Sequence, residues 1–149
     1  MNRSSYIATV AIALLAFAFG TNTSLAQVRP SKASVELILV EASNNNSGVD
    51  SSLTAYANTL KRLFRFNSYR QISRTTTQLD LPGSTVAKLG QGNTLKITAR
   101  ASGREIAANL EWSAGIHARL KLKPRTPAVL GGPKIKNESG TYLLIVKLR

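Results

Sequence analysis

Cysteine is absent from this chain of 149 residues. Disulfide bonds, which stabilise many small secreted domains, are therefore excluded, and an apolar core has to stabilise the fold alone. The absence also excludes a lipid anchor on a cysteine. For an exported chain it favours a bacterial envelope over a eukaryotic secretory route, where disulfide bonds are usual.

Histidine is nearly absent as well, because His117 is the only one. A zinc or copper site would have to combine this single imidazole with scattered carboxylates. A Ser-His-acid triad would depend on the same residue, and the chain has no Gly-x-Ser-x-Gly motif. A Ser-Lys dyad stays open, since both residue types are common. We predict a non-enzymatic protein without metal or cofactor.

Acidic residues are scarce, with 7 Asp and Glu against 20 Lys and Arg, which gives a formal net charge of +13 at pH 7. So few carboxylates among so many cations are expected to serve as surface ion partners, which argues against paired-carboxylate catalysis. A charge excess of this size attracts anions such as nucleic acid, lipopolysaccharide, acidic glycans and acidic proteins. The charge alone does not choose among them.

The first 26 residues have the pattern of a cleaved secretory signal. Arg3 gives a positive start, residues 7–20 are almost all apolar, and Ser24 and Ala26 put small residues at the −3 and −1 positions before Gln27. The apolar run is shorter than the roughly 20 residues that span a bilayer, so an uncleaved anchor is the weaker alternative. We expect a mature chain of residues 27–149 with no transmembrane helix, periplasmic or extracellular, and of bacterial origin.

Residues 27–149 suffice for one domain with a core. Residues 34–41 and 141–148 are apolar on both faces, which predicts central strands. Residues 106–112 and 116–122 alternate between apolar and polar, as half-buried strands do. The segment 90–93, Gly-Gln-Gly-Asn, predicts a hairpin turn.

One segment has helical periodicity instead. Its apolar residues recur at the spacing of an amphipathic helix: Leu53, Tyr56, Ala57, Leu60, Leu63 and Phe64. Asp50, Ser51 or Ser52 can cap its first turn. We predict an α+β fold with a mainly antiparallel sheet of about six or seven strands and this helix, over residues 53–64, packed on one face. A β-sandwich with an inserted helix is the alternative.

Cations recur on the polar side of the predicted strands. Because alternate residues of a strand share a face, the row on residues 119–123 and a neighbouring hairpin can form one patch. The candidate anion-binding residues are Lys96, Arg100, Arg104, Arg119, Lys121, Lys123 and Arg125. A solvated sheet face without a ligand is the alternative. Aromatic and arginine residues also interleave over 64–70, but Phe64 and Phe66 are better explained as core residues than as a base-stacking platform.

The C-terminal segment carries a weak resemblance. Residues 126–133, Thr-Pro-Ala-Val-Leu-Gly-Gly-Pro, and the strand 141–146, Thr-Tyr-Leu-Leu-Ile-Val, resemble a strand pair of secretin-type proteins of type II and type III secretion. Residues 35–67 are similar to small exported bacterial β-rich proteins of unassigned function. The longer pore-forming region of secretins has no counterpart, so the resemblance implies no site residue.

Together these patterns predict an exported interaction module of the bacterial envelope, working beside a secretion or surface assembly and binding an envelope protein. The alternative function is a cationic binder of nucleic acid or envelope polyanions, meaning lipopolysaccharide or acidic glycans. A small hydrolase is a distant third.

Overall fold

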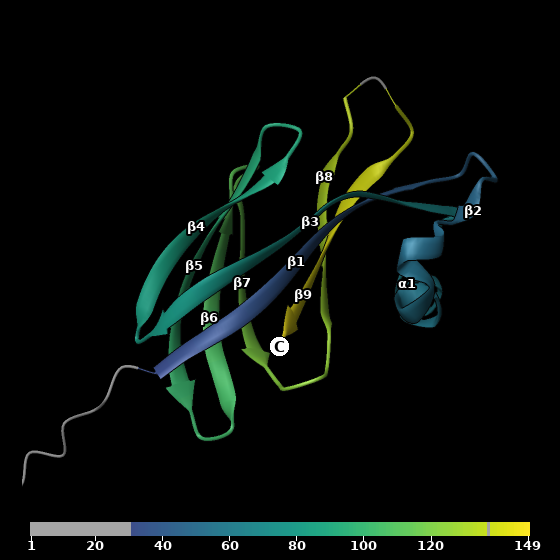
Figure 1. Ribbon diagram of the computed structural model, residues 1–149. Helices are drawn as coiled ribbons and strands as arrows, with labels where there is room; N and C mark the ends of the chain where they lie inside the picture. The colour runs from purple at the N-terminus through teal and green to yellow at the C-terminus, as the bar shows by residue number, and fades with distance from the viewer. Residues whose placement is uncertain (1–30, 137) are drawn as a thin grey trace, which may run out of the picture.

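The computed structural model describes residues 31–136 and 138–149, and the predicted signal segment lies outside them. Within these residues the chain forms strands, one short 3₁₀ segment and one α-helix (Figure 1). In chain order the elements are β1 (Ser31–Ser43), β2 (Gly48–Val49), η1 (Ser51–Tyr56), α1 (Ala57–Leu63), β3 (Ser68–Leu81), β4 (Gly83–Gly90), β5 (Asn93–Ser102), β6 (Glu105–Trp112), β7 (Ile116–Leu122), β8 (Ala128–Lys134) and β9 (Thr141–Leu148).

The strands form two sheets. One has five strands in the order β2-β3-β1-β9-β8, and the other has four in the order β4-β5-β6-β7. All pairs are antiparallel except the short β2–β3 pair. The predicted α+β class with its single helix is confirmed. The strands are divided between two sheets, which is the arrangement of the sandwich alternative, and the described residues contain nine strands.

β1 lies at the centre of the five-stranded sheet because it is apolar on both faces. Val35, Leu37 and Leu39 point into the core between the sheets, whereas Ile38 and Val40 point to the other side. β9 pairs with β1 and is buried on both faces in the same way. The two central strands expected from the sequence are therefore confirmed.

The main core lies between the two sheets. It combines inward residues of β1, β3 and β9 with the alternating apolar residues of the four-stranded sheet. At one end of this core the ring of Trp112 packs on Gly132 of β8, where a Cβ would overlap the ring and lie 2.6 Å from the carbonyl oxygen of Tyr142. The indole Nε1 of Trp112 donates a hydrogen bond to Asn93 at 2.9 Å. Gly132 is thus required for close packing of the two sheets.

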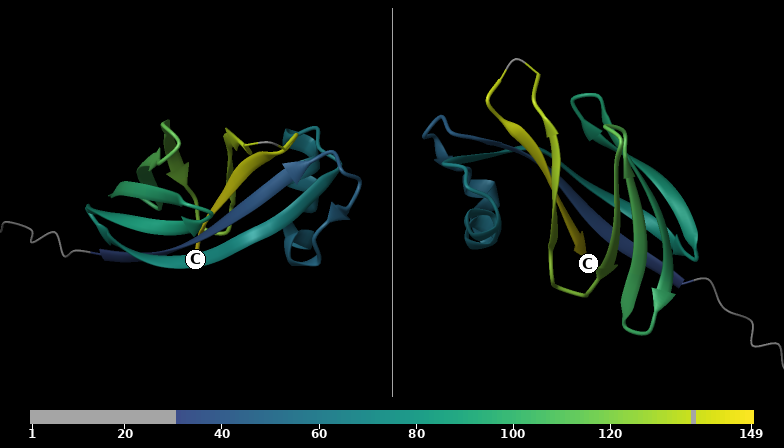
Figure 2. Two further views of the ribbon diagram at one scale, coloured as in Figure 1. Left: turned by 90° about the horizontal axis from the view of Figure 1, so that it is seen from above. Right: turned by 180° about the vertical axis from the view of Figure 1, so that it is seen from behind.

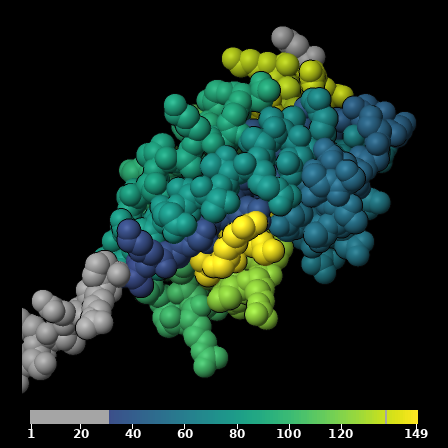
Figure 3. Space-filling view, viewed as in Figure 1, coloured from purple at the N-terminus to yellow at the C-terminus, as the bar shows by residue number. Residues whose placement is uncertain are grey.

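The helical segment covers the far side of the five-stranded sheet. Leu53, Tyr56 and Leu60 are buried there against Ile38 and Ile145. Figures 1 and 2 show the resulting three layers, with the four-stranded sheet, the five-stranded sheet and then α1. In the space-filling view η1 and α1 form one block of atoms at the side of the molecule away from the β5–β6 turn (Figure 3).

The helix is shorter than its apolar stripe predicts. Residues 51–56 are 3₁₀, the α-helix ends at Leu63, and 53% of Leu63 is exposed. The chain leaves the helix at Phe64, whose φ of −131° and ψ of 144° are extended, and the hydroxyl of buried Tyr69 donates to the carbonyl oxygens of Leu60 at 3.2 Å and Phe64 at 2.9 Å. The chain therefore turns into β3 before Leu63 can reach the sheet.

Candidate anion-binding face

The four-stranded sheet has one face toward the core and one face toward solvent. We call the outward side the open face, because no helix of the described residues covers it (Figure 2). Its residues are those that alternate with the core residues of each strand. Strand alternation thus puts the polar half of every strand on one surface.

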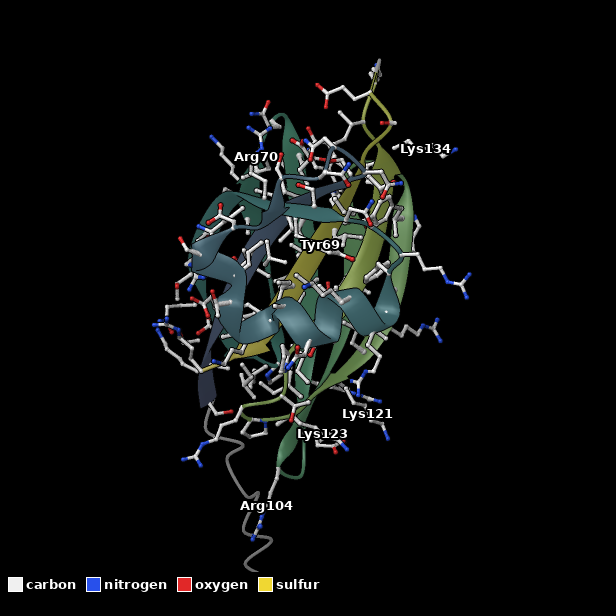
Figure 4. All side chains as sticks on the ribbon, turned by 90° about the vertical axis from the view of Figure 1, so that its right-hand side faces the viewer. Tyr69, Arg70, Arg104, Lys121, Lys123 and Lys134 are labelled. Atoms are coloured by element: carbon white, nitrogen blue, oxygen red, sulfur yellow. The ribbon has the colours of Figure 1, made fainter. Side chains whose placement is uncertain are left out.

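Five of the seven predicted anion-binding residues lie on the open face. Four of them are outward residues of β5 and β7, and the fifth directly follows β7: Lys96, Arg100, Arg119, Lys121 and Lys123. Arg104 lies in the β5–β6 turn and Arg125 in the β7–β8 connection with a φ of 63°. Figure 4 shows Lys121, Lys123 and Arg104 in succession toward one end of the molecule.

The register places the open-face residues in rows that run across the strands. Thr98, Asn109 and Arg119 are side by side on β5, β6 and β7. The adjacent outward row contains Arg100, Ala107 and Lys121. Neither row contains a carboxylate, and together the two adjacent rows hold three cations.

The rows at either end are different because each contains a carboxylate on the middle strand. Lys96 Nζ lies 3.5 Å from Glu111, and Lys123 Nζ lies 3.5 Å from Glu105. Among the described residues, no ion pair involves Arg100, Arg119 or Lys121. The patch therefore has two neutralised ends and an unneutralised centre.

The unneutralised centre surrounds an open groove with a volume of about 750 Å³. Ala107 lies in the groove between the longer side chains of Arg100 and Lys121, while Arg119 and Pro82 lie at its sides. The hydroxyls of Ser84 and Thr98, 3.2 Å apart, and the amide of Asn109 add hydrogen-bonding groups. The groove offers cations, hydrogen-bonding groups and a small apolar surface.

Sequence reasoning missed some polar side chains of the open face. Lys88 also points outward, because it alternates with buried Ala87 and Leu89 on β4, and this alternation was visible in the sequence. Ser84 could not be placed beside Thr98 from the sequence, since this requires the register of β4 on β5.

The other residues weighed for chemistry have structural roles or exposed positions. His117 is exposed on the open face, opposite Glu111. Tyr69 is buried under α1 (Figure 4), and burial raises the pKa of its hydroxyl. Arg70 pairs with Glu41 at 2.6 Å, and this hydrogen bond raises the pKa of the guanidinium. Phe64 and Phe66 pack against the same cluster as Tyr69, as expected for core residues.

Metal and membrane sites were also considered. Within residues 31–136 and 138–149, no group of three or more His, Cys, Asp or Glu side chains could hold a metal ion. In the same part of the chain, no helix has the length and apolar character to cross a membrane. No protein-family model, curated protein or solved structure matches the chain. The resemblance to secretin-type proteins therefore stays a prediction.

Proposed function

We propose that this chain is an exported, non-enzymatic binding module of the bacterial envelope that holds an anionic partner on the open face. The observation that carries the proposal is the cluster of Arg100, Arg119 and Lys121 around one groove, with no carboxylate paired to any of them in the described residues. Cations that the fold leaves unneutralised attract anionic groups from solution. The face binds by charge and hydrogen bonds, which require no chemical step.

This proposal joins the two functions expected from the sequence. An acidic surface of an envelope protein and a polyanion such as nucleic acid, lipopolysaccharide or an acidic glycan present the same charge to the open face. A place beside a secretion or surface assembly, in the periplasm or outside the cell, agrees with the signal pattern of residues 1–26.

The experiment measures the salt dependence of binding. Protein is purified from its native host, and mass spectrometry is expected to find Gln27 at its N-terminus. Its affinity for two probes, heparin and a short duplex DNA, is then measured across salt concentrations. Binding by counterion release makes log K fall linearly with log salt, with a slope of roughly 0.9 per phosphate contacted on duplex DNA.

Two triple variants locate the binding surface. Replacing Arg100, Arg119 and Lys121 by Gln is expected to lower the DNA slope by about two to three, because each lost phosphate contact removes about one unit. The control replaces exposed Lys61, Arg62 and Arg65 by Gln, which changes the net charge equally on the helical side. Equal losses in both variants would contradict the proposal, as would a wild type that binds neither probe at low salt.

A further inference from the structure

The groove on the open face is limited in length. Along β6 the outward residues run from Glu111 through Asn109 and Ala107 to Glu105, so a carboxylate lies at each end. Outward residues on one strand are about 6.6 Å apart, since the rise is about 3.3 Å per residue. An extended polyanion that followed the strand direction would pass beyond the unpaired cations within two residues of the centre, because a carboxylate offsets the lysine in each end row. The groove therefore favours a short anionic unit, or a chain that crosses the strands.

The width of the groove suits a ring. Arg100 and Lys121 are separated by β6, and neighbouring strands lie about 4.8 Å apart, so their backbones are about 10 Å apart. Only the methyl group of Ala107 projects between them. The C–H face of one sugar ring can lie on this methyl group with an anionic substituent directed to either cation.

The polar groups of the groove are those that bind hydroxyl groups. Ser84 and Thr98 can donate and accept, and the amide of Asn109 does both. The residues that line the groove include no aromatic side chain, although nucleobase recognition relies on aromatic stacking. The lining therefore matches a hydroxylated anion better than a nucleic acid.

We infer that the groove around Ala107 binds an acidic saccharide, a sugar unit that carries a carboxylate. Its ring lies on Ala107, its hydroxyls bond to Thr98 and Asn109, and its carboxylate lies between the cations Arg119 and Lys121. This inference rests on the proposed function and names the chemistry of the anion. The saccharide can belong to a free oligosaccharide or to the sugar portion of a glycolipid, which present the same carboxylated ring.

The test compares two anions of equal charge. Isothermal titration calorimetry measures the affinity of the protein for trigalacturonate and for an oligothymidylate with three negative charges at the same salt concentration. We expect trigalacturonate to bind at least about tenfold more tightly, because it alone offers ring hydroxyls with the carboxylate. Equal affinities would overturn the inference. Vesicles with and without a uronate-bearing glycolipid then distinguish a membrane source from a free oligosaccharide.

A larger side chain at the bottom of the groove tests whether binding depends on the shape of the groove as well as on its charge. Ala107→Leu leaves the charge unchanged, and its position on the open face keeps it out of the core. We expect it to weaken trigalacturonate binding at least about tenfold while the salt slope for duplex DNA stays as in the wild type. The matched control is Val86→Leu, which enlarges an exposed apolar residue of the same face outside the groove and is expected to change neither.

A second variant tests the groove independently, in case Ala107→Leu disturbs the sheet. Thr98→Val removes one groove hydroxyl without altering charge or β-branched shape, and we expect it to weaken trigalacturonate binding severalfold. Unchanged saccharide affinity in both variants, with a reduced DNA slope in the triple Gln variant, would overturn this inference and leave the proposed function standing. Absence of heparin and DNA binding by the wild type would contradict both.

Discussion

The outer faces of the two sheets differ in composition and in what covers them. The five-stranded sheet presents Ile38, Val40 and Ile145 outward, and η1 and α1 bury them. The four-stranded sheet presents lysines and arginines outward, and within residues 31–136 and 138–149 no helix covers them. An apolar face is stabilised by being covered, whereas a cationic face stays hydrated in water. The uncovered face is therefore the one on which we propose that an anion binds.

Charged residues follow the same division. Glu36 on the covered side is 2% exposed and contacts Arg74 at 3.1 Å and Arg149 at 3.0 Å. On the open face Lys96 and Glu111 form a pair in which both side chains are about half exposed. On the covered side a buried carboxylate thus contacts two arginines, whereas Arg100, Arg119 and Lys121 of the open face form no ion pair among the described residues.

The largest expected effect tests how strongly η1 and α1 stabilise the five-stranded sheet that they cover. Leu60 is fully buried between α1 and the five-stranded sheet, so Leu60→Ala should lower the free energy of unfolding by about 2–5 kcal/mol. Asn58→Ala, at an exposed position of the same helix, should change it by less than about 0.5 kcal/mol. Denaturant titration measures both. Small and equal effects would show that the helix does not stabilise the sheet.

An intermediate effect compares the two kinds of ion pair. Glu36→Gln removes a buried charge that accepts from two arginines and should cost about 1–3 kcal/mol of unfolding free energy. Glu111→Gln breaks an exposed pair and should cost at most about 1 kcal/mol. Thermal and denaturant unfolding distinguish them. A larger loss in the Glu111 variant would reverse the comparison.

The smallest expected effect concerns Asp50, which caps the N-terminal end of η1, and it depends on pH. The backbone N–H of Ser52 at 3.0 Å, its hydroxyl and the backbone N–H of Gln71 donate to Asp50 and lower the pKa of its carboxyl. A lowered folded-state pKa stabilises the protein above the unfolded pKa of about 3.9 and loses this effect as pH falls further.

The Asp50→Asn variant lacks this titration. Melting temperatures are measured from about pH 6 to about pH 2. We expect the wild type to melt at a higher temperature than the variant near pH 6, and this difference to decrease as the pH falls. Asp80→Asn, which removes a carboxylate with only an exposed contact to Lys32 at 3.8 Å, controls for loss of charge. A difference between the wild type and Asp50→Asn that stays constant over this pH range would contradict a role for the carboxylate.

Local pattern was enough to predict many elements. The apolar faces of β1 and β9, the alternation in β6 and β7, and the turn at residues 90–93 each follow from neighbours in the sequence. The outward position of Lys96, Arg100, Arg119 and Lys121 follows from the same alternation. These features depend on side chains only a few residues apart, which is why the sequence by itself determines them.

Contacts between distant residues decided the rest. The division into two sheets and the packing of Trp112 on Gly132 both depend on segments far apart in the chain. The same is true of the groove, because only the register of β5, β6 and β7 pairs Glu111 with Lys96 and leaves Arg100 beside Ala107. The sequence determined how many cations the protein has and which face of each strand carries them. The tertiary structure alone decided which of those cations carboxylates neutralise, since neutralisation depends on distances across strands that no local pattern contains.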